Sequence, residues 1–317
     1  MRCQMIKFIN RNFDKKCLNQ NDIFICAFGY ECRSMALYQK IKPVISTSNI
    51  LAFVFDDYKK YDYIANQIDE VISDKDIIIE KVKYESAIDV CNSIKKMIQT
   101  KMQKEESITV HIDYSSMPRK WYCQLPLLLR HNLREKDRVF FWYVTGAYPV
   151  DYEVYPSAGI DSFSVLGKPS LRIGTKRMHV VGLSYDAVRT SAMISILDPD
   201  SYITCNAYNR DNKEISDNVR LVNEQVISRA NMEISLQIDD FSFMISKLCE
   251  IANEFLPLGD VILVPDGPKP LIFAMSMIPL LLGKPGVTCL HVSRNKEYYS
   301  AVNVDPTDKI YGFSVIE

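Results

Sequence analysis

The chain has 317 residues, of which 47% are hydrophobic and 24% are charged, and its formal net charge is −1. This composition is typical of a globular protein with about two domains, and the near-zero net charge argues against a broad DNA-binding face. No segment has the pattern of a signal peptide or the length of a membrane span, so we expect a cytoplasmic protein that makes no membrane contact.

From residue 22 onward, the first half of the chain alternates apolar runs with helical patterns. The run IFICAF leads into a polar turn, and SITVHI leads into a turn that contains serine, proline and two cations. In chain order we expect a strand, turn and helix start at 22–34, a strand at 49–57, a helix at 86–102, a strand at 107–112, a helix at 122–133 and a strand at 138–146.

The second half repeats this order of elements. The strand DVILV, like SITVHI in the first half, is followed by a turn that contains proline and a cation. We expect a strand, turn and helix start at 178–191, a strand at 201–209, a helix at 239–255, a strand and turn at 260–270, a helix at 271–282 and a strand at 286–294.

Individual residues in the two halves also match, at a spacing near 150. Together with the repeated order of elements, these matches indicate a tandem duplication. Near-continuous apolar strands with helices between them predict parallel sheets that are covered on both faces. The matched segments are YECRS (30–34) with YDAVRTS (185–191), Pro118-Arg119 with Pro268-Lys269, and DSFSV (161–165) with YGFSV (311–315).

The predicted fold class is therefore α/β, with two tandem Rossmann-like units related by an internal pseudo-twofold duplication. One large sheet without duplication is the alternative. Residues 149–177 are expected to hold a strand extension and a linker, because prolines and glycines recur there. The expected domains are an N-terminal extension at 1–21, a first unit at 22–165, a linker at 166–177 and a second unit at 178–317.

The motifs of several site classes are absent from the sequence. The nine cysteines form no CxxC pair and the four histidines are dispersed, so we expect reduced thiols and no metal site. The sequence contains no GxGxxG, GxxxxGK[ST], GxSxG or HExxH motif. These absences disfavour a dinucleotide cofactor, a P-loop nucleotidase, an α/β-hydrolase and a zinc protease, and we expect no cofactor.

In open α/β sheets, ligands bind at the carboxyl ends of the strands, near a reversal of strand order. The loops after the first and fourth strands of each half combine cations, hydroxyls and aromatic rings, and each precedes a helix whose N-terminus attracts anions. Such groups suit the phosphate and the base of a nucleotide. The candidate ligand-binding residues are Tyr30, Arg33, Ser34, Ser115, Ser116, Arg119, Lys120, Tyr185, Arg189, Asp266, Gly267 and Lys269, and Trp121 is either a stacking residue or part of the core.

These candidates also have structural interpretations. Arg33 and Arg189 would then be exposed helix residues, or they would pair with Glu31 and Asp186. Asp113, at the end of an expected strand, would be a turn acceptor. A purely structural role for these residues would leave the loops without a ligand.

Two loops carry a resemblance to a known family. A strand, a small or polar turn and a cation that opens a helix occur in PDGPKPL (265–271) and, more divergently, in YSSMPRKW (114–121). This arrangement resembles the nucleotide-binding loop of the CRISPR-associated Rossmann fold (CARF) superfamily, and two fused units resemble SAVED domains. The family threonines and second glycine are absent from both loops.

The resemblance implies that Arg119 and Lys269 contact phosphate, with Ser115, Ser116, Asp266 and Gly267 in the same loops. It implies a sensor subunit of prokaryotic antiviral defence that binds a cyclic or linear oligonucleotide between its two halves. The expected effector would be a partner protein, because the two halves use up the chain.

Two further functions stay open. One is a metal-independent phosphodiesterase (a ring nuclease) or another nucleotide-processing enzyme, for which Asp113, Ser115 and Ser116 beside Arg119 and Lys120 are the candidate catalytic residues. The other is a scaffold subunit of a defence complex that binds no nucleotide.

Overall fold

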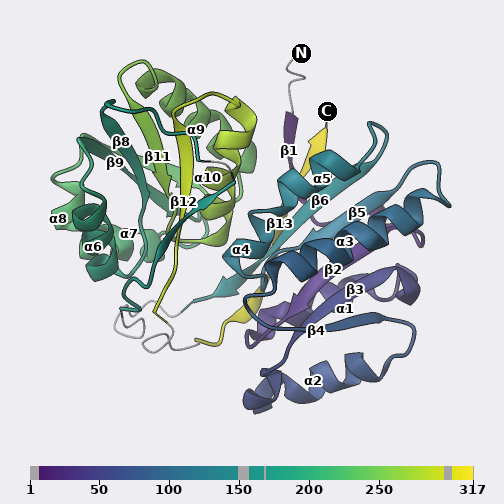
Figure 1. The fold of residues 1–317 in the computed structure, drawn as a ribbon. Helices are drawn as coiled ribbons and strands as arrows, with labels where there is room; N and C mark the ends of the chain where they lie inside the picture. Colours follow the sequence, from purple (N-terminus) through teal and green to yellow (C-terminus); the bar gives the residue numbers. More distant parts are fainter. Residues whose placement is uncertain (1–6, 149–156, 168, 296–301, 317) are drawn as a thin grey trace. The chain divides into compact units, whose positions relative to one another are not determined.

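A computed structural model describes residues 7–148, 157–167, 169–295 and 302–316. The chain forms two compact units, and each unit is built on its own sheet (Figure 1). Both sheets are mostly parallel and carry helices, which confirms the predicted α/β class. Unit 1 comprises Met1–Tyr148 and Val302–Glu317, and unit 2 comprises Pro149–Ala301.

Within the described residues, the sheet of unit 1 has seven strands in the order β1-β13-β6-β5-β2-β3-β4. Strands β2 to β6 pair in parallel, whereas β13 pairs antiparallel with both β6 and β1. The central strand β2 is buried along its length, as its continuous apolar sequence predicts. The strands are β1 Lys7–Asn12, β2 Ile23–Phe28, β3 Ile50–Phe55, β4 Ile78–Val82, β5 Thr109–Asp113, β6 Arg138–Ala147 and β13 Asp305–Ile316.

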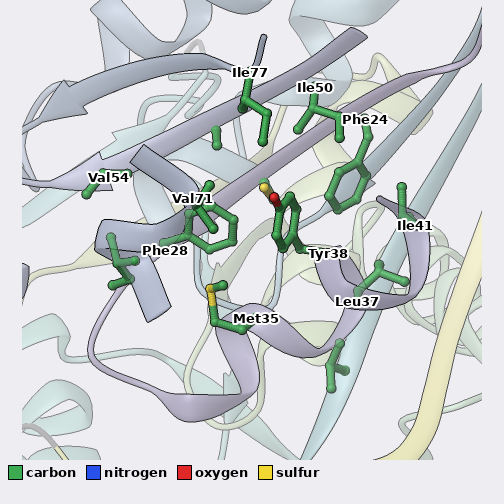
Figure 2. Close-up of a cluster of buried hydrophobic side chains, with 14 of the residues drawn as sticks. Phe24, Phe28, Met35, Leu37, Tyr38, Ile41, Ile50, Val54, Val71 and Ile77 are labelled. Carbon is green, nitrogen blue, oxygen red and sulfur yellow. The ribbon is translucent and has the colours of Figure 1, made fainter. Parts of the chain in front are cut away.

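Helices cover both faces of this sheet. Phe24 and Phe28 of β2 pack with residues of α1 and α2 on one face, in the apolar cluster of Figure 2. Phe53 and Phe55 of β3 point to the other face, where their rings contact Trp121 of α4. The helices are α1 Ala36–Ile41, α2 Asp62–Ser73, α3 Ala87–Met102, α4 Arg119–Tyr122 and α5 Leu125–Asn132, with short 3-10 turns η1 Lys15–Cys17, η2 Cys32–Met35, η3 Thr47–Asn49 and η4 Tyr58–Lys60.

The part of unit 2 that the structure describes holds a sheet of six strands, in the order β10-β9-β8-β11-β12-β7. Five of these strands run parallel, and the edge strand β7 pairs antiparallel with β12. Every residue of β11 is buried, as its sequence DVILV predicts. The strands are β7 Phe163–Leu166, β8 Arg177–Gly182, β9 Ser201–Tyr208, β10 Met232–Gln237, β11 Asp260–Val264 and β12 Val287–Val292.

Both faces of the second sheet also carry helices. Met193 of α6 packs with Val181 and Val264 of the sheet, while α10 contacts α9, β11 and β12. Asp186 and Asp240 cap α6 and α9, because each carboxylate accepts a hydrogen bond from a backbone amide of the first turn. The helices are α6 Ala187–Leu197, α7 Lys213–Val222, α8 Glu224–Ile227, α9 Phe241–Phe255 and α10 Lys269–Leu282. None of the helices in the described residues is long and apolar enough to cross a membrane.

The two sheets share one order of parallel strands. Numbered by their appearance in each unit, the parallel strands follow 3-2-1-4-5, and an antiparallel strand pairs with the fifth in both cases. The alternative of one large sheet is therefore wrong, because the chain builds two. The shared order is consistent with an internal duplication, which remains a proposal.

The boundaries of the units differ from the expected ones. The predicted second unit ran to residue 317, but β13 completes the sheet of unit 1, where Phe313 pairs with Phe141. The predicted first unit ran to residue 165, but β7 lies in unit 2, where Phe163 pairs with Val292. Both matched FSV segments therefore lie in strands that pair antiparallel with the fifth parallel strand of a sheet. In each case that sheet belongs to the unit to which the predicted boundaries did not assign the segment.

The predicted linker and N-terminal extension are also parts of the sheets. β1 lies within the expected extension and pairs with β13. Within the expected linker, the Arg172 side chain donates to the Asp260 carboxylate over 2.6 Å, and the Ser170 carbonyl accepts from the Gly286 amide over 2.6 Å. These bonds attach the segment to unit 2. The expected strand extension near 149–156 lies outside the described residues.

Candidate functional site

The strand order reverses at one place in each sheet, between β2 and β5 in unit 1 and between β8 and β11 in unit 2. Ligands of open α/β folds bind at the carboxyl ends of the strands at this point. The sequence-predicted residues all lie at the ends of these four strands or in the loops and helix starts that follow them. Each unit therefore brings its own candidates to one edge of one sheet.

The first loop of unit 1 contains a buried arginine. Arg33 donates to the Glu31 carboxylate through Nε over 2.8 Å and through Nη2 over 3.1 Å, and to the hydroxyl of Tyr143 over 3.0 Å. Its guanidinium also lies 5.4 Å from the ring centroid of Tyr148. Burial alone would lower the pKa of Arg33, but the charge of Glu31, the neighbouring Tyr148 and Tyr143 and the hydrogen bond to Glu31 together outweigh burial and raise the pKa. Arg33 therefore stays charged and holds the loop. This agrees with the structural interpretation of Arg33, in which it pairs with Glu31.

The end of β5 forms a second hydrogen-bonded cluster. Asp113 accepts from the backbone amide of Ser115 over 2.9 Å and from its hydroxyl. The Ser115 hydroxyl in turn accepts from the amide of Val144 over 2.7 Å. Asp113 and Ser115 are both buried. They join the turn after β5 to β6, which agrees with the interpretation of Asp113 as a turn acceptor.

Two other serines at this edge have unsatisfied hydroxyls. Ser34 follows Arg33 in the loop after β2, and Ser116 follows Ser115 in the loop after β5. Both Oγ atoms are buried and have no hydrogen-bond partner among the residues that the structure describes. A buried polar group without a hydrogen bond costs about 1–3 kcal/mol, so we expect water, an ion or a ligand to bind it. One such hydroxyl stands on each side of the reversal point.

The cations after the fourth strands occupy matching helix positions. Arg119 is the first residue of α4 and Lys269 the first residue of α10, and a proline with extended backbone precedes each one. Both side chains are half-buried, whereas Lys120 is exposed. Trp121 is fully buried, so it belongs to the core rather than to a stacking surface.

In unit 2 a buried arginine lies in the first turn of α6, directly after the first loop, and it pairs across the reversal point. Arg189 donates through Nη1 to Asp266 over 2.6 Å and through Nη2 to the Val292 carbonyl over 2.9 Å. Asp266 also accepts from the Ser184 hydroxyl over 3.0 Å. The expected partner Asp186 instead caps α6 by accepting from the Arg189 backbone amide.

Glycine allows the two loops of unit 2 to approach each other. Gly267 has a φ of +91°, and a Cβ atom there would lie 2.4 Å from the Leu183 carbonyl oxygen. A Cβ atom on Gly182 would lie 2.5 Å from the Asp266 carbonyl oxygen. Gly267 thus has a steric role in joining the loops, and Tyr185 lies half-buried in the first of them.

Sequence reasoning missed the segments that precede the antiparallel strands. In unit 1 the carboxamide of Asn303 accepts from the Cys32 amide over 3.0 Å, and the Val304 carbonyl accepts from the Arg33 amide over 3.1 Å. In unit 2 the Ala158 amide donates to the Asp186 carboxylate over 2.9 Å. Each first loop is therefore held by a segment that no local pattern connects to it.

The described residues contain no group of three or more histidine, cysteine, aspartate or glutamate side chains that could hold a metal ion. A scan of protein-family models and a search of curated proteins found no match to the chain.

Proposed function

We propose that this protein binds a phosphate-containing nucleotide, most favourably a cyclic oligonucleotide, and acts as a sensor subunit of prokaryotic antiviral defence. The observation that carries the proposal is the pair of buried, unsatisfied hydroxyls of Ser34 and Ser116 on the two loops of the reversal point in unit 1. Phosphate oxygens accept hydrogen bonds from hydroxyls and are attracted by cations such as Arg119 in the same loop.

In this proposal the candidates have different roles. Arg33 and Arg189 are positioning residues, because each is buried and hydrogen-bonded to protein groups. In unit 1, Ser34, Ser116 and Arg119 contact a ligand molecule; in unit 2, Lys269 contacts one. A half-buried cation at the first residue of a helix adds to the positive end of the helix dipole, which is the stronger effect in the longer helix α10.

The test is thermal unfolding of the whole chain with cyclic and linear di-, tri- and tetranucleotides. A ligand at one hundred times its dissociation constant adds about 2.7 kcal/mol to the folded state, which corresponds to several degrees. We expect Arg119→Ala or Lys269→Ala to reduce the shift. Two variants should leave the shift unchanged: Arg130→Ala, which replaces an exposed cation in the last turn of α5, and Lys284→Ala, which replaces an exposed cation just after the end of α10.

Two results decide against the proposal. If no nucleotide of the panel shifts the unfolding temperature, the scaffold alternative is favoured. If both variants keep the full shift, the ligand binds outside the loops at the reversal points. Recovery of a bound cyclic nucleotide in cleaved form would identify the phosphodiesterase alternative instead. Calorimetric stoichiometry would tell whether one or two ligand molecules bind per chain.

A further inference from the structure

The helix α7 lies on the sheet of unit 2 with little apolar packing. Of its ten residues only Ser216 and Val219 are buried, and Leu221 in its last turn is 65% exposed. The helix with the same place in unit 1 is α2, which also connects the second and third parallel strands. Apolar burial, the main force that holds a helix on a sheet, is weaker for α7 than for α2. In the apolar cluster of Figure 2, α2 buries Ile64, Ile68 and Val71.

Hydrogen bonds from two asparagines attach α7 to the rest of unit 2. Asn206 of β9 donates through Nδ2 to the Ser216 carbonyl over 3.1 Å. Asn223, the residue after α7, donates through Nδ2 to the carbonyls of Val219 and Ser184, over 2.8 Å in each case. Ser184 lies in the loop after β8, at the reversal point. The end of α7 is therefore bonded to this loop.

The polar side chains beneath α7 have unpaired atoms. The Thr204 hydroxyl and the Oδ1 atoms of Asn206 and Asn223 are buried and have no hydrogen-bond partner among the residues that the structure describes. Thr204 and Asn206 point to the same face of β9, because they are two residues apart. Each buried polar atom without a partner raises the free energy of the closed state, in which α7 covers the sheet. When α7 leaves the sheet, bulk water can bond to all three atoms, so these atoms favour opening.

The matching strand of unit 1 is apolar at the positions of Thr204 and Asn206. Aligning the segments YECRS and YDAVRTS sets Cys26 on Val181, and the sheet partners of these two residues define the match between β3 and β9. The matching residues of β3 are fully buried in the apolar cluster of unit 1 (Figure 2). The two units thus carry a matched pair of helices, one above an apolar strand and one above a polar strand. The matches are Ala52 with Thr204 and Val54 with Asn206.

We propose that α7 is a cover that opens by local unfolding, at a free energy well below that of unfolding unit 2 as a whole. A helix of ten residues is marginally stable in water on its own, so α7 unfolds when it detaches. Opening breaks the bond from Asn223 to the Ser184 carbonyl and releases the loop after β8. This inference goes beyond the proposed nucleotide site and requires no ligand.

Native-state hydrogen exchange of the whole chain, measured by mass spectrometry without ligand, tests the proposal. Amides of α7 should exchange at least about a hundredfold faster than those of α9, a helix of the same unit that buries six apolar residues. Low concentrations of urea should accelerate exchange in α9 more than in α7, because global unfolding exposes the larger surface. α2 should be protected like α3 of its own unit, because apolar residues lie beneath it.

A pair of threonine variants tests the cause of opening. Thr204→Val removes the unpaired hydroxyl and keeps the shape of the side chain, so it should slow exchange in α7 about tenfold. Exchange in the loop at 183–186 should slow with it, because the loop is released only when α7 opens. The matched control is Thr288→Val in β12. Thr288 is 1% exposed, but its hydroxyl accepts from the Ser170 amide over 3.1 Å, so this variant should not slow exchange in α7.

Each part of the proposal has a result that contradicts it. Equal rates and equal urea dependence in α7 and α9 would show that α7 opens only when unit 2 unfolds. Fast exchange in α7 that Thr204→Val leaves unchanged, or equally fast exchange in α2, would overturn the polar strand as the cause of opening. If Thr204→Val slowed α7 and left the loop at 183–186 unchanged, the release of the loop by α7 would be wrong.

Discussion

Arg189 and Asp266 form a fully buried ion pair at the reversal point of unit 2, with 2.6 Å between Nη1 and Oδ2. Removing one member of such a pair leaves an uncompensated buried charge, which costs about 3–5 kcal/mol. We therefore expect Asp266→Asn to lower the free energy of unfolding of unit 2 by this amount. Urea denaturation followed by far-ultraviolet circular dichroism measures the loss.

An exposed pair in the same unit is the control for this prediction. Arg220 and Glu233 also form a short ion pair, but the Arg220 side chain is 53% exposed. Glu233→Gln should cost less than about 1 kcal/mol, because solvent screens such a pair. The double variant Arg189→Met/Asp266→Leu should recover much of the stability that Asp266→Asn loses. Equal losses for the buried and exposed pairs would contradict a structural role of Arg189 and Asp266.

His179 makes the stability of unit 2 depend on pH. It is buried on β8, and neither ring nitrogen has a hydrogen-bond partner in the described part of the chain. Burial lowers its pKa from 6.5 to about 4; nearby Arg177 lowers it further, and Asp200 partly opposes the shift. The unfolded chain thus takes up a proton near pH 6.5 that the folded unit resists until about pH 4.

This difference in proton uptake favours the unfolded state in acid. The contribution of uncharged His179 to the free energy of unfolding is complete above pH 6.5. It is lost progressively as the pH falls to about 4, and the whole loss is about 3 kcal/mol. We expect His179→Leu to be less sensitive to acid than the unchanged chain over this range. Urea denaturation at several pH values measures the difference between the two proteins, so that carboxylates common to both cancel. Parallel pH profiles would show that His179 titrates normally.

The C-terminal strand should stabilise unit 1. Phe313 of β13 is 1% exposed, and its ring stacks on Phe141 of β6 with centroids 5.0 Å apart. We expect Phe313→Ala to cost about 3–5 kcal/mol, the usual loss for a buried phenylalanine. Tryptophan fluorescence reports this loss selectively, because both tryptophans, Trp121 and Trp142, are buried in unit 1.

The control is the residue that matches Phe313 in the first half of the sequence. Phe163 of β7 is half-buried and belongs to unit 2. Phe163→Ala should therefore cost less and should alter the unfolding of unit 2. If Phe163→Ala disturbed the tryptophan signal more than Phe313→Ala does, the assignment of β13 to unit 1 would be in error.

The apolar runs predicted the central strands, because a parallel strand that is covered on both faces is made almost entirely of apolar residues. IFICAF and DVILV became β2 and β11, both buried throughout. The edge strands β4 and β10 were missed, since IIEKV and MEISLQ have residues that face solvent. The polar helix α7 was missed for a similar reason, because KEISDNVRLV buries only Ser216 and Val219.

The candidate site could be predicted only in part. Local motifs located the loops after β2, β5, β8 and β11, and the structure gathers each pair at one sheet edge. The partners of these loops depend on contacts that no local pattern contains. Arg33 reaches Tyr143 across 110 residues, and the Cys32 amide reaches Asn303 across 271. The pairing of β13 with β6 is likewise set by the finished sheet rather than by the sequence near either strand.

Ser115 and Ser116 are adjacent, and replacing each by alanine should have opposite consequences. The Ser115 hydroxyl donates to Asp113 and accepts from the Val144 amide, so Ser115→Ala removes one hydrogen bond from the buried Asp113 carboxylate and takes this acceptor from the Val144 amide. We expect a loss of about 2–3 kcal/mol in the free energy of unfolding without ligand. Ser116→Ala removes a buried hydroxyl that has no partner in the described residues, so stability without ligand should stay the same or rise slightly.

For ligand binding we expect the opposite ranking: Ser116→Ala should have the larger effect and Ser115→Ala the smaller one. If Ser116 donates to a phosphate oxygen, Ser116→Ala should reduce the thermal shift that the best ligand of the panel produces, by the equivalent of about 1.5–3 kcal/mol for a bond to a charged acceptor. Ser115→Ala should retain most of its shift, measured from its own lower midpoint. Ser116→Thr, which keeps the hydroxyl, serves as a further comparison. An unchanged shift in Ser116→Ala would mean that water, rather than phosphate, satisfies this hydroxyl.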